Sequence, residues 1–231
     1  MTRKLALITL LSLLLTRTAT AAPGVVDLAL QDVGTGSVAE MKRSIFSLPF
    51  TVYDAKDYRP AIASLPQSIR EGRISEGQLL RRVESIIRPV IELHHHTDKI
   101  ELFLYRDEFA RAMVWLGCVL VISDALADRL HDDELAGIVA HEMGHAYFMI
   151  ETIKARKHGD HQAMKIVELE CDAVAMLTLK LLGHDPADHF RGLRGVTNID
   201  RTNGSNRIDS RDYPSIGERA QFAQRFIKLL A

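Results

Sequence analysis

The sequence has few cysteines and no excess of positive charge. Its 231 residues include 2 cysteines, 29 basic residues (Lys and Arg) and 30 acidic residues (Asp and Glu), so the formal net charge is −1. Proteins that bind nucleic acid usually carry a basic patch or stripe, and because none is present, nucleic acid is not expected as a partner. Cys118 and Cys171 could form a disulfide in an oxidising compartment, or could be two small buried hydrophobic residues.

Long apolar segments are also missing, apart from one near the N-terminus. A basic start is followed by the apolar run Leu5–Leu15, which is too short to span a bilayer comfortably. Small residues follow, and Ala19-Thr20-Ala21 fits the rule for signal-peptide cleavage. We therefore expect residues 1–21 to be a signal peptide cleaved after Ala21, which predicts a periplasmic or secreted protein with no integral membrane segment after cleavage. The alternative is an uncleaved N-terminal anchor.

The rest of the chain divides into an extension and one larger domain. Residues 22–75 have weak periodicity and several glycines and prolines, so we interpret them as an N-terminal extension that packs on the main domain. Within it, Phe50–Asp54 could form a short strand. Residues 76–231 are enough to form the main domain around one sizeable core.

Hydrophobic periodicity predicts the first elements of the main domain. Residues 76–94, or one residue more at the start, have an apolar face at helical spacing. His94–His96 are predicted to form a solvated turn at the end of this helix, with a second metal site as the alternative. Lys99–Tyr105 alternates like a strand, and Ala112–Ser123 has the pattern of a long strand or of a hairpin bent at Gly117.

Two long helices and a shorter one are predicted in the second half. The first runs from Asp132 to about Arg156, and the second runs from Asp160 to Leu182 and is closed by Gly183. Residues 184–214 are rich in Gly, Asn, Asp and Arg and are predicted to form one long loop, which is usually functional or disordered at this length. A capping box at Ser215–Glu218 then begins the last helix.

Two histidines one turn apart on the first long helix suggest a metal site. His141–His145 has the pattern HExxH, and on a helical wheel both imidazoles border the apolar stripe and face the same way, as two ligands of one zinc ion require. Glu142 lies within the stripe, where an unpaired ionised carboxylate is unfavourable. A general base that faces metal-activated water explains this position, whereas core packing does not. Gly144 is predicted to let another segment approach the helix, or to be simply tolerated.

The second long helix also has acidic residues on its apolar face. Glu168 and Asp172 lie on its otherwise apolar stripe, at helical spacing from residues such as Cys171 and Leu179. Glu170 lies off this stripe, where a solvated acid is expected. Glu168 can supply the third zinc ligand, and Asp172 is placed to accept a hydrogen bond from the outer ring nitrogen of a ligand histidine. Because both helices bury acids that need a partner, we predict a zinc site and not a packed core.

These motifs resemble a known family. HExxH followed by ExxxD on a second helix is the pattern of the gluzincins, and the sequence is most similar to the HtpX and CAAX prenyl endopeptidase family. Asp132–Phe148 (DDELAGIVAHEMGHAYF), Glu168–Asp172 (ELECD) and Arg111–Ser123 carry the resemblance, and Tyr213-Pro214 with Arg219 resembles the end of the family pattern. The resemblance implies an α+β, zincin-like fold, in which a small antiparallel or mixed sheet packs on the HExxH helix and a second, ExxxD-bearing helix.

The resemblance also implies a binding site for the substrate. Arg111, Ala112 and Met113 would lie in the edge strand above the zinc, where an extended peptide adds as another strand. Arg111 replaces the family's Asn, and Arg suits bidentate contact with a carboxylate, so a preference for substrates with an acid near the cut is expected. The alternative is that Arg111 is a solvated charge that protects the edge of the sheet from aggregation.

We therefore expect a zinc-dependent endopeptidase that hydrolyses periplasmic or secreted proteins or peptides. Zinc would be held by His141, His145 and Glu168, and Glu142 would take a proton from the attacking water. The alternatives are a catalytically idle zinc domain that acts as a chaperone or partner-binding module, and a metal hydrolase of small molecules.

Three further interpretations concern residues near the C-terminus. Tyr213 and Arg219 could stabilise the transition state, or could have loop and capping roles. The predicted loop 184–214 could cover the zinc, and His184 or His189 could then displace the water and make the enzyme latent. The alternative is a disordered surface loop.

Overall fold

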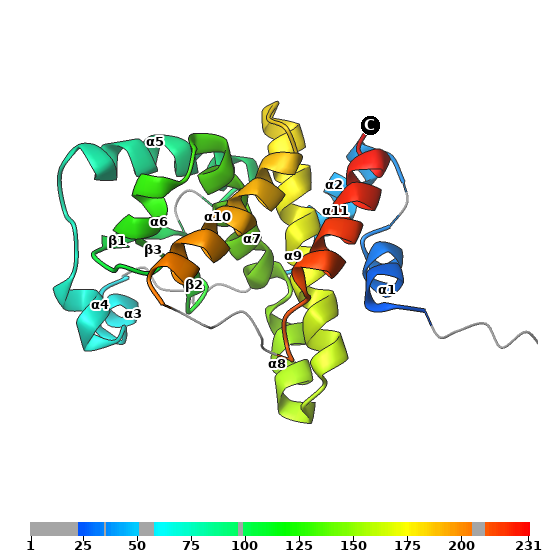
Figure 1. Cartoon of the computed structure of the whole chain (residues 1–231), viewed down its shortest axis with the longest axis horizontal. Helices are drawn as coiled ribbons and strands as arrows, with labels where there is room; N and C mark the ends of the chain where they lie inside the picture. Colours follow the sequence, from blue (N-terminus) through cyan, green and yellow to red (C-terminus); the bar gives the residue numbers. More distant parts are fainter. Residues whose placement is uncertain (1–22, 35, 51–57, 97–98, 205–210) are drawn as a thin grey trace, which may run out of the picture.

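The computed structural model describes residues 23–34, 36–50, 58–96, 99–204 and 211–231. The predicted signal peptide and most of the predicted strand at Phe50–Asp54 lie outside the described residues. Helices make up most of the structure, and one small sheet accompanies them (Figure 1). The elements are α1 (Val25–Asp32), α2 (Val38–Phe46), α3 (Arg59–Ala63), α4 (Gln67–Glu71), α5 (Gln78–Leu93), β1 (Glu101–Tyr105), β2 (Ala112–Trp115), β3 (Val119–Ser123), α6 (Asp124–Arg129), α7 (Asp132–Tyr147), α8 (Met149–His158), α9 (His161–Leu182), α10 (Ala187–Thr202) and α11 (Ile216–Leu229).

The sheet is mixed, with strand order β1-β3-β2. β1 pairs with β3 in parallel, and β2 pairs with β3 in antiparallel, from Ala112 opposite Ile122 to Trp115 opposite Val119. The chain turns at Leu116 and Gly117, which both have positive φ (49° and 71°). The hairpin alternative is thus confirmed, and β2 lies at an edge of the sheet. The expected α+β class is confirmed as well, and the arrangement is consistent with a zincin-like fold.

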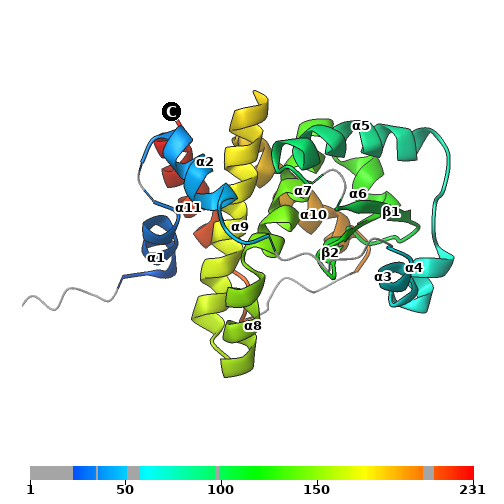
Figure 2. The same cartoon turned by 180° about the vertical axis from the view of Figure 1, so that it is seen from behind.

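Helices α7 and α9 pack side by side through the middle of the molecule (Figures 1 and 2). Gly144 of α7 lies at their contact, where an added Cβ would be 2.9 Å from the Cα atom of Cys171. This close approach confirms the predicted role of Gly144. Helix α9 begins where Asp160 accepts a hydrogen bond from the Ala163 N–H (2.9 Å) and ends at Gly183 in the left-handed conformation (φ 84°), as predicted.

The first long helix is shorter than predicted. It ends at Tyr147, and Phe148, with φ −98° and ψ 22°, separates it from α8. The predicted helix from Asp132 to Arg156 is therefore wrong as a single element, although almost all of its residues are helical. Helices α5 and α11 begin and end close to their predicted positions, and Ser215 and Glu218 form the predicted capping box.

The residues before α5 pack at both ends of the molecule. Helices α1 and α2 contact α9 and α11, whereas α3 and α4 lie beside the sheet (Figures 1 and 2). The proposed division into residues 22–75 and 76–231 stays a prediction. Among the described residues, Cys118 and Cys171 are both buried free thiols, so they are small buried residues and form no disulfide. No described helix is long and apolar enough to cross a membrane.

Residues 184–214 do not form one long loop, and this prediction is wrong. Ala187–Thr202 is a helix, α10, that packs on α7. Gly192, one of the glycines that suggested a loop, lies where α10 comes very close to α7: its added Cβ would be 2.9 Å from the Glu134 carbonyl oxygen. The favourable packing therefore outweighs the low intrinsic helix propensity of glycine, and this packing partner is invisible in the local sequence.

The three adjacent histidines are not a solvated turn. His94 is buried, and its ring nitrogens lie 2.9 Å from the Tyr147 hydroxyl and 3.0 Å from the Thr178 hydroxyl. His96 is also buried and stacks on Phe50, with 3.6 Å between the ring centroids. The prediction is therefore wrong for two of the three, because tertiary neighbours cover the end of the helix.

Glu170 of α9, which the helical wheel places on a solvated face, is buried instead. Burial, reinforced by the nearby negative charges of Asp32 and Glu151, raises the pKa of Glu170 from 4.5 to about 8. The unfolded chain gives up this proton near pH 4.5, whereas the folded protein keeps it to about pH 8. Stability is therefore lost as the pH rises through this window.

We expect Glu170→Gln to stabilise the protein at pH 8, because the uncharged amide avoids the cost of ionising a buried carboxylate. The melting temperature should rise by a few degrees at pH 8, and the gain should disappear at pH 4.5 and below. Thermal unfolding followed by circular dichroism across this range measures the effect. Glu92→Gln, at an exposed position on α5, is the control. A gain that does not depend on pH would contradict the assignment.

Candidate metal centre

His141, His145 and Glu168 converge at the contact between α7 and α9. The Nε2 atom of His141 lies 3.5 Å from Oε2 of Glu168, and the Nε2 atom of His145 lies 3.7 Å from Oε1 of the same carboxylate. The two rings are nearly perpendicular, at 86°. The HExxH spacing and the acid on the second helix thus bring together the three side chains that the sequence predicts as ligands.

The geometry of this group fits a zinc ion. Tetrahedral zinc with bonds of about 2.0–2.1 Å to nitrogen and oxygen places its ligand atoms about 3.3 Å apart, close to the distances found here. Two imidazoles and one carboxylate are also a ligand set typical of catalytic zinc. Burial opposes ionisation of Glu168, but its hydrogen bond with His141 and the charges of His145 and Arg219 lower its pKa to about 2. The carboxylate is therefore in the form that binds a metal.

The outer nitrogen of each histidine has its own partner on α9. Nδ1 of His141 lies 2.9 Å from Oδ1 of Asp172, close in distance although the angle is not that of a good hydrogen bond. Nδ1 of His145 lies 3.4 Å from the sulfur of Cys171. If both Nε2 atoms bind a zinc ion, the ring protons would lie on Nδ1, toward these partners. The sequence predicted the position of Asp172 but missed Cys171, whose only signal was its place on the same stripe.

Arg219, from the first turn of α11, bridges the two acids of α9. Its guanidinium donates to Oδ1 of Asp172 and, over 2.9 Å, to Oε2 of Glu168, and its side chain is only 10% exposed. Arg219 thus holds both carboxylates, and it also lines the cavity in front of the ligands, so its transition-state role stays a prediction. Tyr213 is 49% exposed and lines the cavity in front of the ligands.

The two histidines predicted to gate the site do not face the cavity. His184 contacts Asp133 at the start of α7, with 3.0 Å between Nδ1 and Oδ1. His189 is buried behind the ligands, where its Nε2 lies 2.9 Å from Oδ1 of Asp172. The latent state built on these residues is therefore not supported. His141, Asp172 and His189 could also surround a cation, but the guanidinium of Arg219 contacts the same carboxylate oxygen and disfavours a second positive ion there.

A cavity of about 390 Å³ opens in front of the three ligands. The edge strand β2 forms one side of it and α10 the opposite side, and a further cavity of about 680 Å³ continues along the strand. The two share residues from both walls: Ala112, Met113, Leu193, Val196, Tyr213 and Arg219. Together they form a groove, called here the β2–α10 groove, that leads past the ligands.

Glu142 lies in the β2–α10 groove beside the ligands. It is enclosed by protein but keeps partial exposure to the cavity. Burial raises the pKa of its carboxyl to about 7, although the positive charge of His141 and a hydrogen bond donated by the Val114 N–H oppose this shift. A carboxyl group with a pKa near neutrality can both accept and return a proton at neutral pH.

The side chain of Arg111 contacts two neighbouring residues. Its Nε donates to Oδ2 of Asp107 (3.1 Å), and its guanidinium lies 5.2 Å from the centroid of the Phe109 ring. Its Nε is therefore already paired, but Arg111 also lines the cavity that continues along β2, so its role toward the substrate stays a prediction. Arg156 of α8 lines the other end of the groove and has no hydrogen bond or ion pair from its side chain among the described residues.

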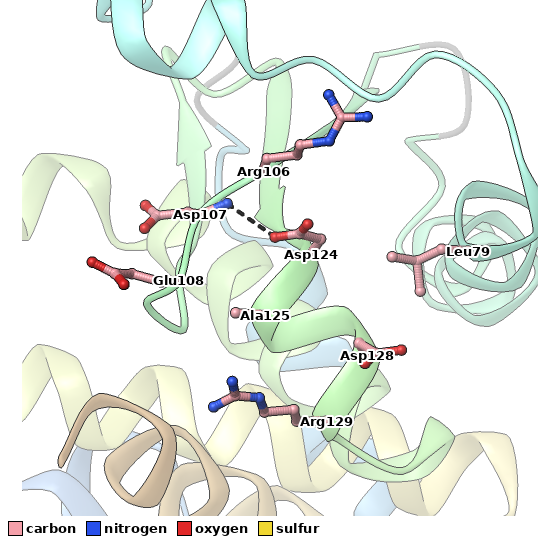
Figure 3. Close-up of a pocket in the computed structure, with 8 residues that line it drawn as sticks. All are labelled: Leu79, Arg106, Asp107, Glu108, Asp124, Ala125, Asp128 and Arg129. Atoms are coloured by element: carbon pink, nitrogen blue, oxygen red, sulfur yellow. Dashed lines mark hydrogen bonds between the residues drawn. The ribbon is translucent and has the colours of Figure 1, made fainter. Parts of the chain in front are cut away.

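A separate cavity of about 680 Å³ lies at the ends of β1 and β3 (Figure 3). It is lined by acidic and basic side chains, among them Arg106, Asp124 and Asp128, and the Asp107 N–H donates to Asp124 (2.9 Å). Among the described residues, none of its acids belongs to a group of three metal-ligating side chains. The metal centre therefore lies in the β2–α10 groove.

The comparison with protein families agrees with this centre. The model of peptidase family M48 matches residues 74–177, just under half of the chain, and this segment holds all three candidate ligands with Glu142 and Asp172. No curated protein matches the chain. The match supports a metallopeptidase of this zinc-dependent family that acts on proteins, while the expected likeness to the HtpX and CAAX prenyl endopeptidases stays a prediction.

We expect Glu168→Ala to lose bound zinc and part of the stability, because metal binding is coupled to folding. Asp172→Asn should weaken zinc about ten- to a hundredfold through the orientation of His141. Elemental analysis after dialysis against a weak chelator measures both. Glu170→Gln, which removes another buried acid of the same helix, is the control and should keep its zinc. Full zinc content in Glu168→Ala would remove this residue from the centre.

Proposed function

We propose that the protein is a zinc-dependent endopeptidase that is exported by its N-terminal segment and cleaves periplasmic or secreted proteins. The observation that carries this proposal is the position of Glu142, in a groove between an edge strand and a set of three ligands suited to zinc. A catalytically idle zinc domain needs neither the groove nor a carboxyl group of raised pKa at this place, so we do not favour that alternative.

The chemistry follows from the arrangement of the side chains. Zinc held by His141, His145 and Glu168 would supply a Lewis acid that polarises a peptide carbonyl and lowers the pKa of water to about 7. Glu142 then takes a proton from the attacking water and returns it to the leaving amine. Asp172 and Cys171 keep the proton of each ligand histidine on Nδ1, so that both Nε2 atoms stay available.

The groove favours an extended peptide as substrate. Among the strands that the structure describes, β2 is paired on one side only, so its other edge offers main-chain groups to which a peptide could add as a further strand. The opposite wall, α10, contributes the apolar side chains Leu193 and Val196. A segment must be unfolded over several residues to lie in such a groove, which favours flexible or damaged proteins over compact ones.

A preference for an acidic side chain also follows from the groove, but from a different arginine than the sequence suggested. Arg111 already contacts Asp107, whereas Arg156, beside Met149 and Thr152, has no hydrogen bond or ion pair among the described residues. Arg219, the other arginine that lines the cavity at the ligands, is paired with Glu168 and Asp172. We propose that Arg156 contacts a substrate carboxylate, as a guanidinium can do with two parallel hydrogen bonds.

We expect Glu142→Gln to lower peptide turnover by several orders of magnitude, since general-base catalysis is removed, while zinc content and fold are kept. Cleavage of a fluorogenic peptide library, with and without chelator, measures turnover, and elemental analysis measures zinc. Activity above a tenth of the wild-type level, with zinc bound, would contradict the proposed mechanism.

We expect wild-type protein to cleave library peptides with an acid at one fixed position faster than matched amides, by about tenfold, the scale of one charged hydrogen-bonded pair. Arg156→Ala should lose this preference and Arg156→Lys should keep part of it. Arg111→Ala is the matched control and should leave the preference unchanged. If Arg111→Ala alone abolishes it, the assignment to Arg156 is wrong.

A further inference from the structure

His189 projects from α10 into the buried space behind the ligands, where the proposed mechanism does not use it. Its ring lies parallel to that of His141, at 18° and with 5.5 Å between the centroids. Its Nε2 is 2.9 Å from Oδ1 of Asp172, the oxygen that also faces Nδ1 of His141. A single carboxylate oxygen therefore lies between a ligand histidine and a histidine of another helix.

Helix α10 can come close to the centre because Gly137 of α7 has no side chain. A Cβ on Gly137 of α7 would be 2.9 Å from the Cα of His189 and 3.2 Å from its backbone nitrogen. Real Cβ atoms do not come so close to a neighbouring backbone. The sequence of α7 thus opens the space that lets His189 reach Asp172, one turn before the first ligand His141.

A histidine is unexpected at position 189. His189 is 1% exposed, and among the described residues its Nδ1 atom has no hydrogen-bond partner. A buried polar atom without a partner lowers stability, so an apolar side chain of similar size would suit a purely structural helix contact better. The carboxylate of Asp172 can only accept, so the Nε2–H of His189 must be the donor between them.

We propose that His189 is a positioning residue of the zinc centre: by donating to Asp172, it fixes the carboxylate that orients His141 as a ligand. This inference rests on the proposed zinc function. Arg219 of α11 donates to the same oxygen, so two helices besides α9 hold the Asp172 carboxylate beside His141. Partners of this kind usually change metal affinity by about ten- to a hundredfold.

Two substitutions separate positioning from packing. His189→Leu introduces an apolar side chain of similar size and removes the hydrogen-bond donor. His189→Gln instead places an amide N–H near the position of Nε2. We expect zinc affinity, measured by competition with a chromophoric chelator, to fall about ten- to a hundredfold in His189→Leu and to recover largely in His189→Gln. His184→Leu, which removes a histidine paired with an aspartate outside the centre, is the matched control.

Two further readouts report on the centre without relying on activity. The visible spectrum of the cobalt-substituted protein should change in His189→Leu, because the orientation of His141 sets the ligand field, and should return toward wild type in His189→Gln. Thermal unfolding of the chelated proteins shows whether each variant folds. Folded His189→Leu with wild-type zinc affinity and cobalt spectrum would overturn the inference alone. Wild-type protein that binds zinc no better than Glu168→Ala would overturn the proposed function and this inference together.

Discussion

The rest of the centre depends on the contacts that the carboxylate of Asp172 makes. It lies on α9, and its Oδ1 atom meets His141 of α7, His189 of α10 and Arg219 of α11. Burial opposes its charge, but Arg219 and the two histidines lower its pKa well below the ordinary value. Removing one partner from a buried ionic group typically costs about 3–5 kcal/mol, so four helices are fixed relative to one another around one atom.

This fixed core explains how a structure whose described residues form only a small sheet can hold the candidate metal centre. Metal ligands and a general base must be held within about 0.5 Å of their working positions, and side chains on packed helices meet this requirement better than side chains on loops. Here the ligands come from α7 and α9, and the opposite wall comes from α10. In the proposed function, substrate recognition is left to the edge strand and to exposed side chains such as Tyr213 and Arg156.

The same reasoning from the sequence succeeded for two acids of α9 and failed for a third. Glu168 and Asp172 lie on an apolar stripe, where an acid needs a partner, and the structure supplies one for each. Glu170 lies on another face and was expected in solvent, yet it is buried near Asp32 and Glu151. An apolar stripe shows one face of a helix that is buried, but it cannot show that other helices cover the remaining faces.

The sequence by itself determined the features that depend on neighbours a few residues away. These are the HExxH and ExxxD spacings on two helices and the helix ends at Asp160 and Gly183. A bend at Gly117 was one of two alternatives that the sequence left open. Only the tertiary structure decided that 187–202 is a helix and that Arg219 supports the ligands. These outcomes depend on contacts between residues far apart in the chain. The role of a glycine, a histidine or an arginine then depends on the group that it contacts in the folded protein, and a local sequence pattern does not show that group.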